Sequence, residues 1–394
     1  MDIHAKAVAV ISANVRYCYD HKEPFRIYHG STNSTRQSQL GQYQKIDTSK
    51  LNHVLSVDAN AKTAWVEPNV PMDSLVEATL PHGLIPPVIM EFPGITAGGG
   101  FSGTAGESSS FRYGFFDRTV IAIEMVLANG EKIQASRTEN SDLFYGAASS
   151  FGTLGVITLL QLQLIEAKAY VELTYHPVNS VLEAVKTIEE TTEDTSNDYL
   201  DGILFSKDSG VILSGRLTNT PKAGVKIQTF TRATDPWFYI HVERTMKMHR
   251  GFDTVTEAIP LVDYLFRYDR GGFWVGKYAF RYFLTPLTAL LVGPWTTSCT
   301  RASCITHSIR AVIQTNTLFK TLLCPTLPPR NSWSTSTQIS HTILSGSVPS
   351  SRLAKRANPL TVSWLRNQPP MRLRCYSTSV SGDPDRRADG LLWI

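Results

Sequence analysis

The residues with the clearest chemical use are the glycines and hydroxyl side chains of residues 91–117, EFPGITAGGGFSGTAGESSSFRYGFFD. Glycine disfavours helix and strand interiors, but it permits close backbone approach and turns N–H groups toward ligand oxygens. Gly98, Gly100 and Gly103 spell GxGxxG without the strand and helix of a dinucleotide fingerprint, and the stretch has no phosphate-loop lysine. Aromatic residues between the glycines argue against a polar linker. We expect a loop around a large, flat, phosphate-bearing cofactor.

Two further segments carry similar residues. The stretch 25–36, FRIYHGSTNSTR, predicts a strand over 25–28 and a polar turn whose N–H and hydroxyl groups could hold a pyrophosphate. An ordinary strand-to-helix turn is the alternative. Residues 152–158, GTLGVIT, predict a glycine turn that enters an apolar strand running to about residue 165.

Hydrophobic periodicity predicts the elements that position these segments. We expect an amphipathic helix over 1–20, with Ala7, Val8, Val10, Ile11 and Val15 as its apolar positions. Strands are predicted at 50–57, 63–68, 120–127 and 131–135, the last two joined by an Asn-Gly hairpin turn, and helices at 70–80 and 141–149. This irregular alternation indicates an α+β fold rather than a doubly wound sheet.

The pattern restarts after residue 166. It predicts strands at 170–175, 199–205 and 210–217 and a helix at 181–192 capped by Ser180. Residues 264–286 then hold nine aromatic side chains with Arg267, Arg270, Lys277 and Arg281 among them. Hydrophobic core is the ordinary interpretation. A lining for a bulky apolar substrate and a basic aromatic face on a membrane are the alternatives.

Composition argues against several classes of protein. The net charge of +4 and the lack of a dense basic run argue against nucleic-acid binding. Five cysteines without paired spacing predict no disulfide framework and a reducing compartment. We expect no metal site and no secretory signal, and no apolar run reaches the length that spans a bilayer. Charge is uneven, because residues 288–394 hold twelve Lys/Arg and three Asp/Glu.

Four motifs occur in an order that resembles a known family. IYHGSTNSTR, VEPNVPMDSLVEATLPHGLIPPV, the glycine-rich stretch and ENSDLFYGAASSFGTLGVIT are similar to the PCMH-type FAD domain of FAD-linked oxidases, named for p-cresol methylhydroxylase and vanillyl-alcohol oxidase. GESSSFRYG, NSDLFY and GTLG, and later DPWFYIHVE and IPLVDYLFRYDRGGFW, look closest to the Δ24-sterol reductases, the Diminuto-like or 24-dehydrocholesterol reductase type. The resemblance covers about residues 5–286.

The resemblance implies three regions. They are a PCMH-type FAD-binding domain of two α+β subdomains (1–166), a partial α+β substrate domain (167–287) and a tail (288–394). FAD would be non-covalent, because the glycine loop has no histidine or cysteine and His29 precedes the first glycine of the turn. The implied cofactor-binding residues are Gly30, Ser31, Thr32, Asn33, Ser34, Thr35, Ile95, Thr96, Ala97, Gly98, Gly99, Gly100, Phe101, Ser102, Gly103, Thr104, Ala105, Gly106, Glu107, Gly152, Gly155 and Val156.

The implied reaction is reduction of a sterol side-chain double bond, with NADPH reducing FAD. Such an alkene also needs a proton donor. Tyr113 and Glu107 are candidates, with a structural role as the alternative for each, and the catalytic residues are unknown. A flavin oxidase of a sugar lactone or alcohol and a non-catalytic flavin-binding remnant stay open. The resemblance implies the endoplasmic reticulum membrane, whereas the sequence itself predicts a cytoplasmic protein or a peripheral membrane contact.

The family pattern stops near residue 286. Shifted codons of the following segments can encode strings that resemble the family's continuation, so we hypothesise a frameshift in the gene or its exons near residues 287–290. A divergent, disordered basic tail is the alternative. Either would leave the substrate domain without its closing half, so the activity of the chain as written stays open.

Overall fold

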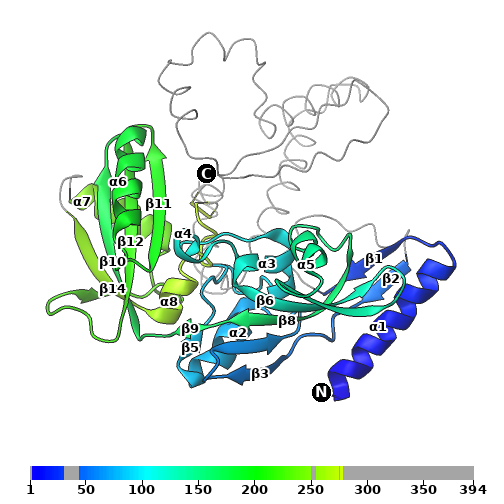
Figure 1. Ribbon diagram of the computed structural model, residues 1–394. Coiled ribbons are helices and arrows are strands. Elements are labelled where there is room, and N and C mark those ends of the chain that lie inside the picture. Colours follow the sequence, from blue (N-terminus) through cyan, green and yellow to red (C-terminus); the bar gives the residue numbers. More distant parts are fainter. Residues whose placement is uncertain (1, 31–43, 250–253, 275, 278–394) are drawn as a thin grey trace, which may run out of the picture. The chain divides into compact units, whose positions relative to one another are not determined.

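Helix α1 (Asp2–Asp20) begins the described part of the chain; the computed structural model describes residues 2–30, 44–249, 254–274 and 276–277 (Figure 1). The predicted amphipathic helix is confirmed, because Val8, Ile11 and Val15 are buried in one apolar cluster with Ile46 of a neighbouring strand. Val10, predicted on the same face, is instead 61% exposed. The apolar stripe is therefore narrower than the pattern suggested.

A five-stranded antiparallel sheet forms the centre of the first region. Its order is β3-β4-β8-β6-β7. The predicted hairpin is confirmed, since β6 pairs with β7 across a turn in which Gly130 has a φ of 80°. The strands are β3 (Val54–Asp58), β4 (Thr63–Val66), β6 (Val120–Leu127), β7 (Lys132–Ser136) and β8 (Gly155–Gln163).

Short elements surround this sheet. Two small pairs of strands are present, with β1 parallel to β2 and β5 antiparallel to β9. Their bounds are β1 (Phe25–Tyr28), β2 (Gln44–Asp47), β5 (Leu84–Ile85) and β9 (Ile165–Glu166). The helices are α2 (Met72–Thr79), η2 (Leu80–His82), α3 (Ala97–Gly103), α4 (Ser110–Tyr113), η3 (Phe116–Thr119) and α5 (Ser141–Ala147).

A second five-stranded sheet follows, in the order β11-β12-β10-β14-β13, with helix α6 packed along it (Figure 1). The predicted cap of α6 is confirmed, because the Ser180 hydroxyl accepts a hydrogen bond of 3.1 Å from the Glu183 N–H. The elements are β10 (Tyr170–Val178), α6 (Val181–Glu193), β11 (Tyr199–Ser206), β12 (Ser209–Thr218), β13 (Lys226–Ile227), α7 (Phe238–Met248), β14 (Val255–Pro260) and α8 (Leu261–Leu265). The predicted α+β class is confirmed.

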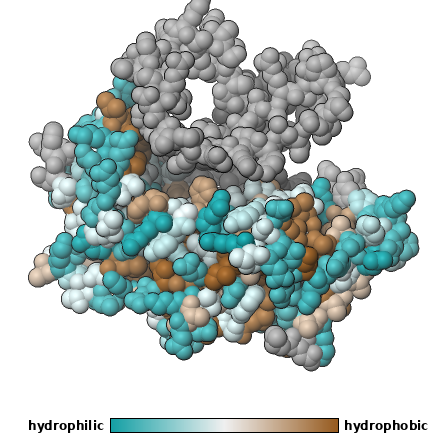
Figure 2. Space-filling view, viewed as in Figure 1, coloured by the Kyte–Doolittle hydropathy of each residue, from teal (hydrophilic) through white to brown (hydrophobic). Residues whose placement is uncertain are grey.

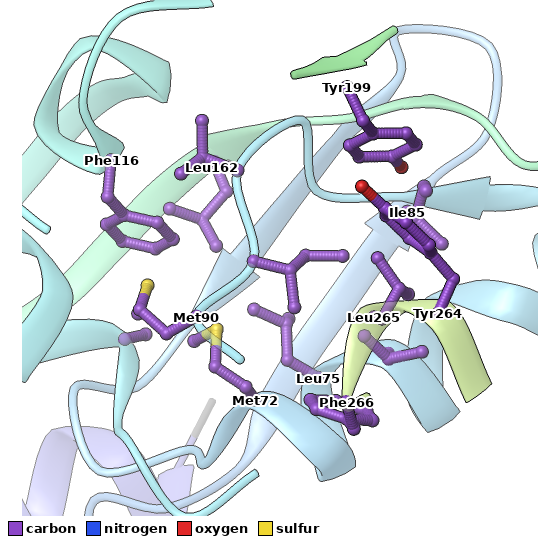
Figure 3. Close-up of a cluster of buried hydrophobic side chains, with 14 of the residues drawn as sticks. Met72, Leu75, Ile85, Met90, Phe116, Leu162, Tyr199, Tyr264, Leu265 and Phe266 are labelled. Carbon is purple, nitrogen blue, oxygen red and sulfur yellow. The ribbon is translucent and has the colours of Figure 1, made fainter. Parts of the chain in front are cut away.

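The hydrophobic core is continuous between residues of both regions. Figure 3 shows one cluster of buried side chains in which Met90 lies beside Phe116 and Leu75 lies toward Leu265 and Phe266 of the segment after β14. Tyr264, Phe266 and Tyr268 are buried, which confirms the core interpretation for the described part of the aromatic stretch, whereas Trp274 is 50% exposed. The core includes α8, so this helix contributes to the packing of the cofactor region as well as to its own sheet.

Hydrophilic and hydrophobic residues are interspersed over the face drawn in Figure 2. Within the described ranges, no helix combines the length and apolar character needed to cross a bilayer. The tail at 288–394, the domain boundary at 287 and the frameshift hypothesis lie outside the described residues. They stay predictions, as do the other predicted domain boundaries.

Candidate cofactor site

A cavity of about 1090 Å³ lies where three predicted segments meet. One wall comes from β1 and the residue after it, Phe25–Ile27 with His29. Another comes from α3 and its cap, and a third from the loop that enters β8. The volume exceeds the roughly 300–1,000 Å³ typical of small-molecule pockets, so the cavity can hold a ligand as large as a dinucleotide.

The glycine-rich stretch forms a helix where the sequence predicted a loop. Residues 97–103, AGGGFSG, are helix α3, and this corrects the expectation that its glycines would keep it irregular. Thr96 caps the helix, since its side chain accepts a hydrogen bond of 3.2 Å from the Gly99 N–H. Phe101 is fully buried and anchors the helix in the core. Tertiary packing therefore outweighs the low helix propensity of glycine.

Glycine is needed in α3 because its backbone lies against another backbone. The Gly98 N–H donates to the Pro68 carbonyl oxygen at 2.7 Å, and a Cβ on Gly98 would lie 2.7 Å from the Pro68 Cβ. The N–H of Gly100 donates to the Thr96 carbonyl. The first-turn N–H groups are thus already bonded, so α3 offers a bare backbone surface for a flat ligand rather than free donors.

The loop before β8 has an unusual backbone at the cavity. Ser149, Phe151 and Gly152 have φ angles of 63°, 51° and 79°, in the left-handed region. A Cβ on Gly152 would also lie 2.8 Å from the Ile27 Cδ1. Phe151 lines the cavity and is 78% exposed. Strained conformations of this kind concentrate at ligand-binding sites, and the exposed ring is available to stack on a bound ring system.

The predicted cofactor-binding residues divide into those that line this cavity and those that do not. The lining members are Thr96, Gly98, Gly99, Ser102, Gly103, Gly152, Gly155 and Val156. Gly30, Ile95, Ala97, Gly100, Phe101, Thr104, Ala105, Gly106 and Glu107 are described but do not line it. Ser31, Thr32, Asn33, Ser34 and Thr35 lie outside the described residues. Their cofactor roles stay predictions.

Sequence reasoning missed several residues of the cavity. Lys22 and Arg26 line it and bring positive charge suited to a diphosphate. Pro68 and Asn69 also line it, and the Asn69 amide donates to the Thr48 carbonyl at 2.5 Å. Pro68 and Asn69 belong to the motif VEPNV, which was part of the family resemblance, so the sequence did contain a signal for them. Phe151 also belongs to a motif of the resemblance, ENSDLFYGAASSFGTLGVIT, but it was not among the predicted cofactor-binding residues.

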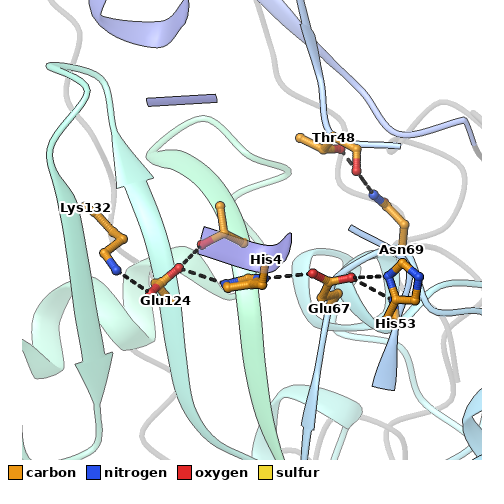
Figure 4. A network of polar contacts seen from close by, with 8 residues as sticks. His4, Thr48, His53, Glu67, Asn69, Glu124 and Lys132 are labelled. Carbon is orange, nitrogen blue, oxygen red and sulfur yellow. Dashed lines mark hydrogen bonds and ion pairs between the residues drawn. The ribbon is translucent and has the colours of Figure 1, made fainter. Parts of the chain in front are cut away.

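A buried polar network holds the elements around the cavity together (Figure 4). Glu67 is 2% exposed, and it bonds His4 of α1 at 2.7 Å and the backbone N–H of His53 at 2.8 Å. Glu124 of β6 accepts from the Thr158 hydroxyl at 2.8 Å and pairs with Lys132 at 3.1 Å. Buried carboxylates with such partners fix the position of α1 on the sheet. Among the described residues, no group of three or more His, Cys, Asp and Glu is placed to hold a metal ion.

A second buried cluster joins the glycine-rich stretch to the second sheet. Arg267 is 1% exposed, and it pairs with Glu91 at 2.7 Å and with Asp201 of β11 at 3.0 Å. Burial raises the pKa of Glu91 to about 7 although Arg267 opposes the shift. Burial also raises the pKa of Glu107 well above its usual value, and the nearby Glu91 charge adds to this. Hence the cluster holds three carboxylates around one cation and takes up protons readily.

The two candidate proton donors lie outside the large cavity. Glu107 is near the Arg267 cluster, and Tyr113 lines a smaller cavity with Arg112. Burial raises the pKa of the Tyr113 phenol. Neither residue therefore has a position beside α3's bare backbone surface, and the proton donor is still unidentified.

Comparison with known proteins agrees with this geometry. Residues 2–136 match the family of the FAD binding domain. The Delta(24)-sterol reductase of Homo sapiens is 32% identical over 267 residues, which cover 64% of this chain and 51% of the relative. That of Arabidopsis thaliana is 34% identical over 244 residues, covering 59% and 43%. Cytokinin dehydrogenase 4 of Oryza sativa subsp. japonica is 26% identical over 177 residues, covering 44% and 32%.

These matches are partial. The chain spans about half the length of the sterol reductases it resembles. The fit of FAD is supported by the α3 glycines that line the cavity, the positive φ at Gly152 and the volume of the cavity. The resemblance inferred from the motifs is thus confirmed: residues 2–136 match the FAD binding domain family, and the chain is similar to Delta(24)-sterol reductases over part of their length.

Proposed function

We propose that this protein is an FAD-dependent oxidoreductase that reduces a carbon–carbon double bond in the side chain of a sterol, with NADPH as the reductant. The observation that carries the proposal is the cavity beside α3, which lies in the FAD-binding domain of a chain similar to Delta(24)-sterol reductases. FAD would supply hydride transfer, and the protein would supply its binding, orientation and surroundings.

The residues of the cavity have separate tasks in this proposal. Gly103 of α3 lines the cavity and no atom lies within 4 Å of its added Cβ, so a flat cofactor could lie against this part of the helix. The Ser102 hydroxyl and the positive charges of Lys22 and Arg26 suit phosphate and sugar oxygens. Phe151 covers an apolar ring.

Non-covalent binding of FAD is part of the proposal. Cys18 and His29, which are residue types that can attach a flavin, both line the cavity. Burial raises the pKa of the Cys18 thiol, which keeps it protonated and weakly nucleophilic. Burial lowers the pKa of His29. Acid precipitation of the protein tests this point: we expect the yellow colour in the supernatant, and colour that stays with the pellet would contradict it.

The main experiment uses the full chain with FAD bound. We expect anaerobic NADPH to bleach the flavin absorbance, and a Δ24 sterol to restore it while gaining two hydrogens by mass spectrometry. NADH and a sterol with a saturated side chain are the controls. If NADPH leaves the absorbance unchanged, the reductase proposal is wrong for this chain.

A flavin oxidase or dehydrogenase of a smaller substrate is the second candidate, favoured by the similarity to cytokinin dehydrogenase 4. In that case, substrate rather than NADPH would bleach the flavin, and for an oxidase oxygen would restore it rapidly. A flavin-binding remnant is the third, because the chain spans only half of its relatives. A yellow protein that reacts with neither NADPH nor substrate would support it.

A further inference from the structure

A second cavity, of about 390 Å³, shares helix α3 with the large one. Phe101 of α3 lines it, while Gly98, Gly99 and Ser102 of the same helix line the large cavity. Its other walls come from α4, η3, α5, the residue after β7 and the end of β8. The volume is at the low end of ligand pockets, and it suits one nucleoside with its phosphate rather than a whole dinucleotide.

Three arginines meet at this cavity. Arg118 pairs through its Nε with Asp117 at 3.3 Å, and within the described ranges its terminal nitrogens have no other partner. Arg137 donates to the backbone carbonyl oxygen of Arg118 at 2.5 Å, which holds the Arg137 guanidinium against the η3 segment at this cavity. Arg112 pairs with Asp198 at 2.7 Å. Guanidinium groups bind phosphate oxygens in a bidentate manner, so the cavity has an excess of phosphate-binding charge.

Aromatic rings line the same cavity. Tyr145 of α5 is 52% exposed, and its ring is therefore open to a planar ligand. Tyr113 is half-buried on the α4 side, with Arg112 5.7 Å from its ring centre. Nucleobases stack on tyrosine and arginine in this way. Phosphate alone would not need such rings.

A hydrogen-bond acceptor also lies at this cavity, beside the arginines and the aromatic rings. Asp117 lines the cavity, and its buried Oδ1 has no hydrogen-bond partner among the described residues. Burial raises the pKa of this carboxyl, while Arg118 and Arg137 oppose the shift. A small rotation of the side chain would let Oδ1 accept from a ribose hydroxyl or a base amino group, which inorganic phosphate at neutral pH offers far less readily.

We propose that this cavity binds a phosphorylated nucleoside, of the kind found at the 2′-phosphoadenosine end of NADPH, through Arg118, Arg137 and Tyr145. The proposal deepens the proposed function, because it assigns a place to the non-reacting end of the reductant. Helix α3 lines both cavities, so the phosphoadenosine end of the reductant and the flavin would bind beside the same helix.

The test measures binding of adenosine 2′,5′-bisphosphate to the flavin-loaded full chain by calorimetry. This probe has no nicotinamide, so its binding does not depend on flavin reduction. We expect binding that Arg118→Gln and Arg137→Gln each weaken about tenfold, and that Arg118→Lys weakens less. Tyr145→Ala should weaken it by a similar factor, through lost stacking. Adenosine without phosphate should bind much more weakly than the bisphosphate.

Arg244→Gln is the matched control, because Arg244 is an exposed arginine of α7 that does not line the cavity. It should leave the affinity unchanged. Thermal unfolding and the flavin spectrum check that each variant is folded. Equal binding by Arg118→Gln, Arg137→Gln and the unchanged protein would overturn the proposal. So would inorganic phosphate binding as tightly as the bisphosphate, or binding only to anionic lipid vesicles.

Experiments can disprove the nucleoside-binding site and the reductase function independently of each other. If the bisphosphate binds as expected but NADPH does not bleach the flavin, this site stands and the reductase function is wrong. If NADPH bleaches the flavin with the same apparent affinity in Arg118→Gln and Arg137→Gln, the function stands and the site is wrong.

Discussion

The middle of the stretch 91–117 and its two flanks are held by different forces. Helix α3, in the middle, packs by backbone contact, as at Gly98 against Pro68. The flanks meet the second region through charged side chains: before α3, Glu91 pairs with Arg267 at 2.7 Å, and after α3, Arg112 pairs with Asp198 at 2.7 Å. Helix α3 therefore requires the absence of side chains at its glycines, whereas the flanks depend on side-chain charge. Steric changes should damage α3, and pH and charge changes should affect the flanks.

The largest effect is expected for Arg267→Met. This change leaves Glu91 and Asp201 without their buried cation, since the guanidinium lies 2.7 Å and 3.0 Å from them. Breaking a buried ion pair on one side lowers stability by about 3–5 kcal/mol. Urea unfolding measures the change.

Acid should partly restore Arg267→Met, because protonation neutralises the stranded carboxylates. The loss should be smaller at about pH 5 than at about pH 8. Arg244→Met, on the exposed side of α7, is the control and should have little effect. A loss that is the same at both pH values would show that packing of Arg267, not its charge, matters.

The unchanged protein should itself respond to pH through Glu91. The folded state raises the pKa of this group from 4.5 to about 7, so the folded state binds the proton more tightly than the unfolded state. By linkage, this contribution to stability is complete below about pH 4.5 and falls as pH rises to about 7, by roughly 3 kcal/mol. The raised pKa of Glu107 acts in the same direction.

Glu91→Gln tests this assignment, because it removes the titrating group and keeps the shape. Its unfolding free energy should decline less between about pH 4.5 and about pH 7 than that of the unchanged protein. Glu77→Gln is the comparison, because Glu77 is exposed on α2 and lies outside the cluster of Arg267 with its buried carboxylates. Parallel pH profiles for the Glu91 variant and the unchanged protein would refute the role of Glu91.

Gly98→Val should disrupt helix α3, in the middle of the stretch. Its Cβ would lie 2.7 Å from the Pro68 Cβ and 2.9 Å from the Pro68 carbonyl oxygen, and the backbone can yield little. We expect a loss of stability of about 1–3 kcal/mol and weaker FAD binding, measured by thermal unfolding and flavin titration. Gly103→Ala is the matched control in the same helix, because no atom lies within 4 Å of its added Cβ. It should leave stability unchanged or raise it by up to about 1 kcal/mol.

Arg112→Gln should have the smallest effect on folding. The arginine side chain is 41% exposed and its partner Asp198 is 19% exposed, so water and salt screen the pair. A change of at most about 1 kcal/mol is expected, and it should shrink as salt is added. A larger loss that salt does not reduce would mean that the contact with the second sheet depends on Arg112 in another way.

Local chemistry allowed much of the fold to be predicted. Helix α1, the hairpin at Gly130 and the Ser180 cap follow from side-chain periodicity and turn residues within a few positions. Helix α3 was missed, because the helix is stabilised by burial of Phe101 and by contact with Pro68, neither of which a local pattern contains. Propensity is a weak guide where tertiary packing decides.

For the candidate site, the sequence alone shows which segments carry the glycines and hydroxyls and which family they resemble. The folded chain is needed to bring Thr96, Gly152 and Phe25 to one cavity and to place Phe151 on its wall. The same holds for Arg267 beside Glu91 and for the arginines of the smaller cavity. Sequence encodes what each residue can do over short range, whereas burial, charge pairing and cavities arise between residues that folding alone brings together.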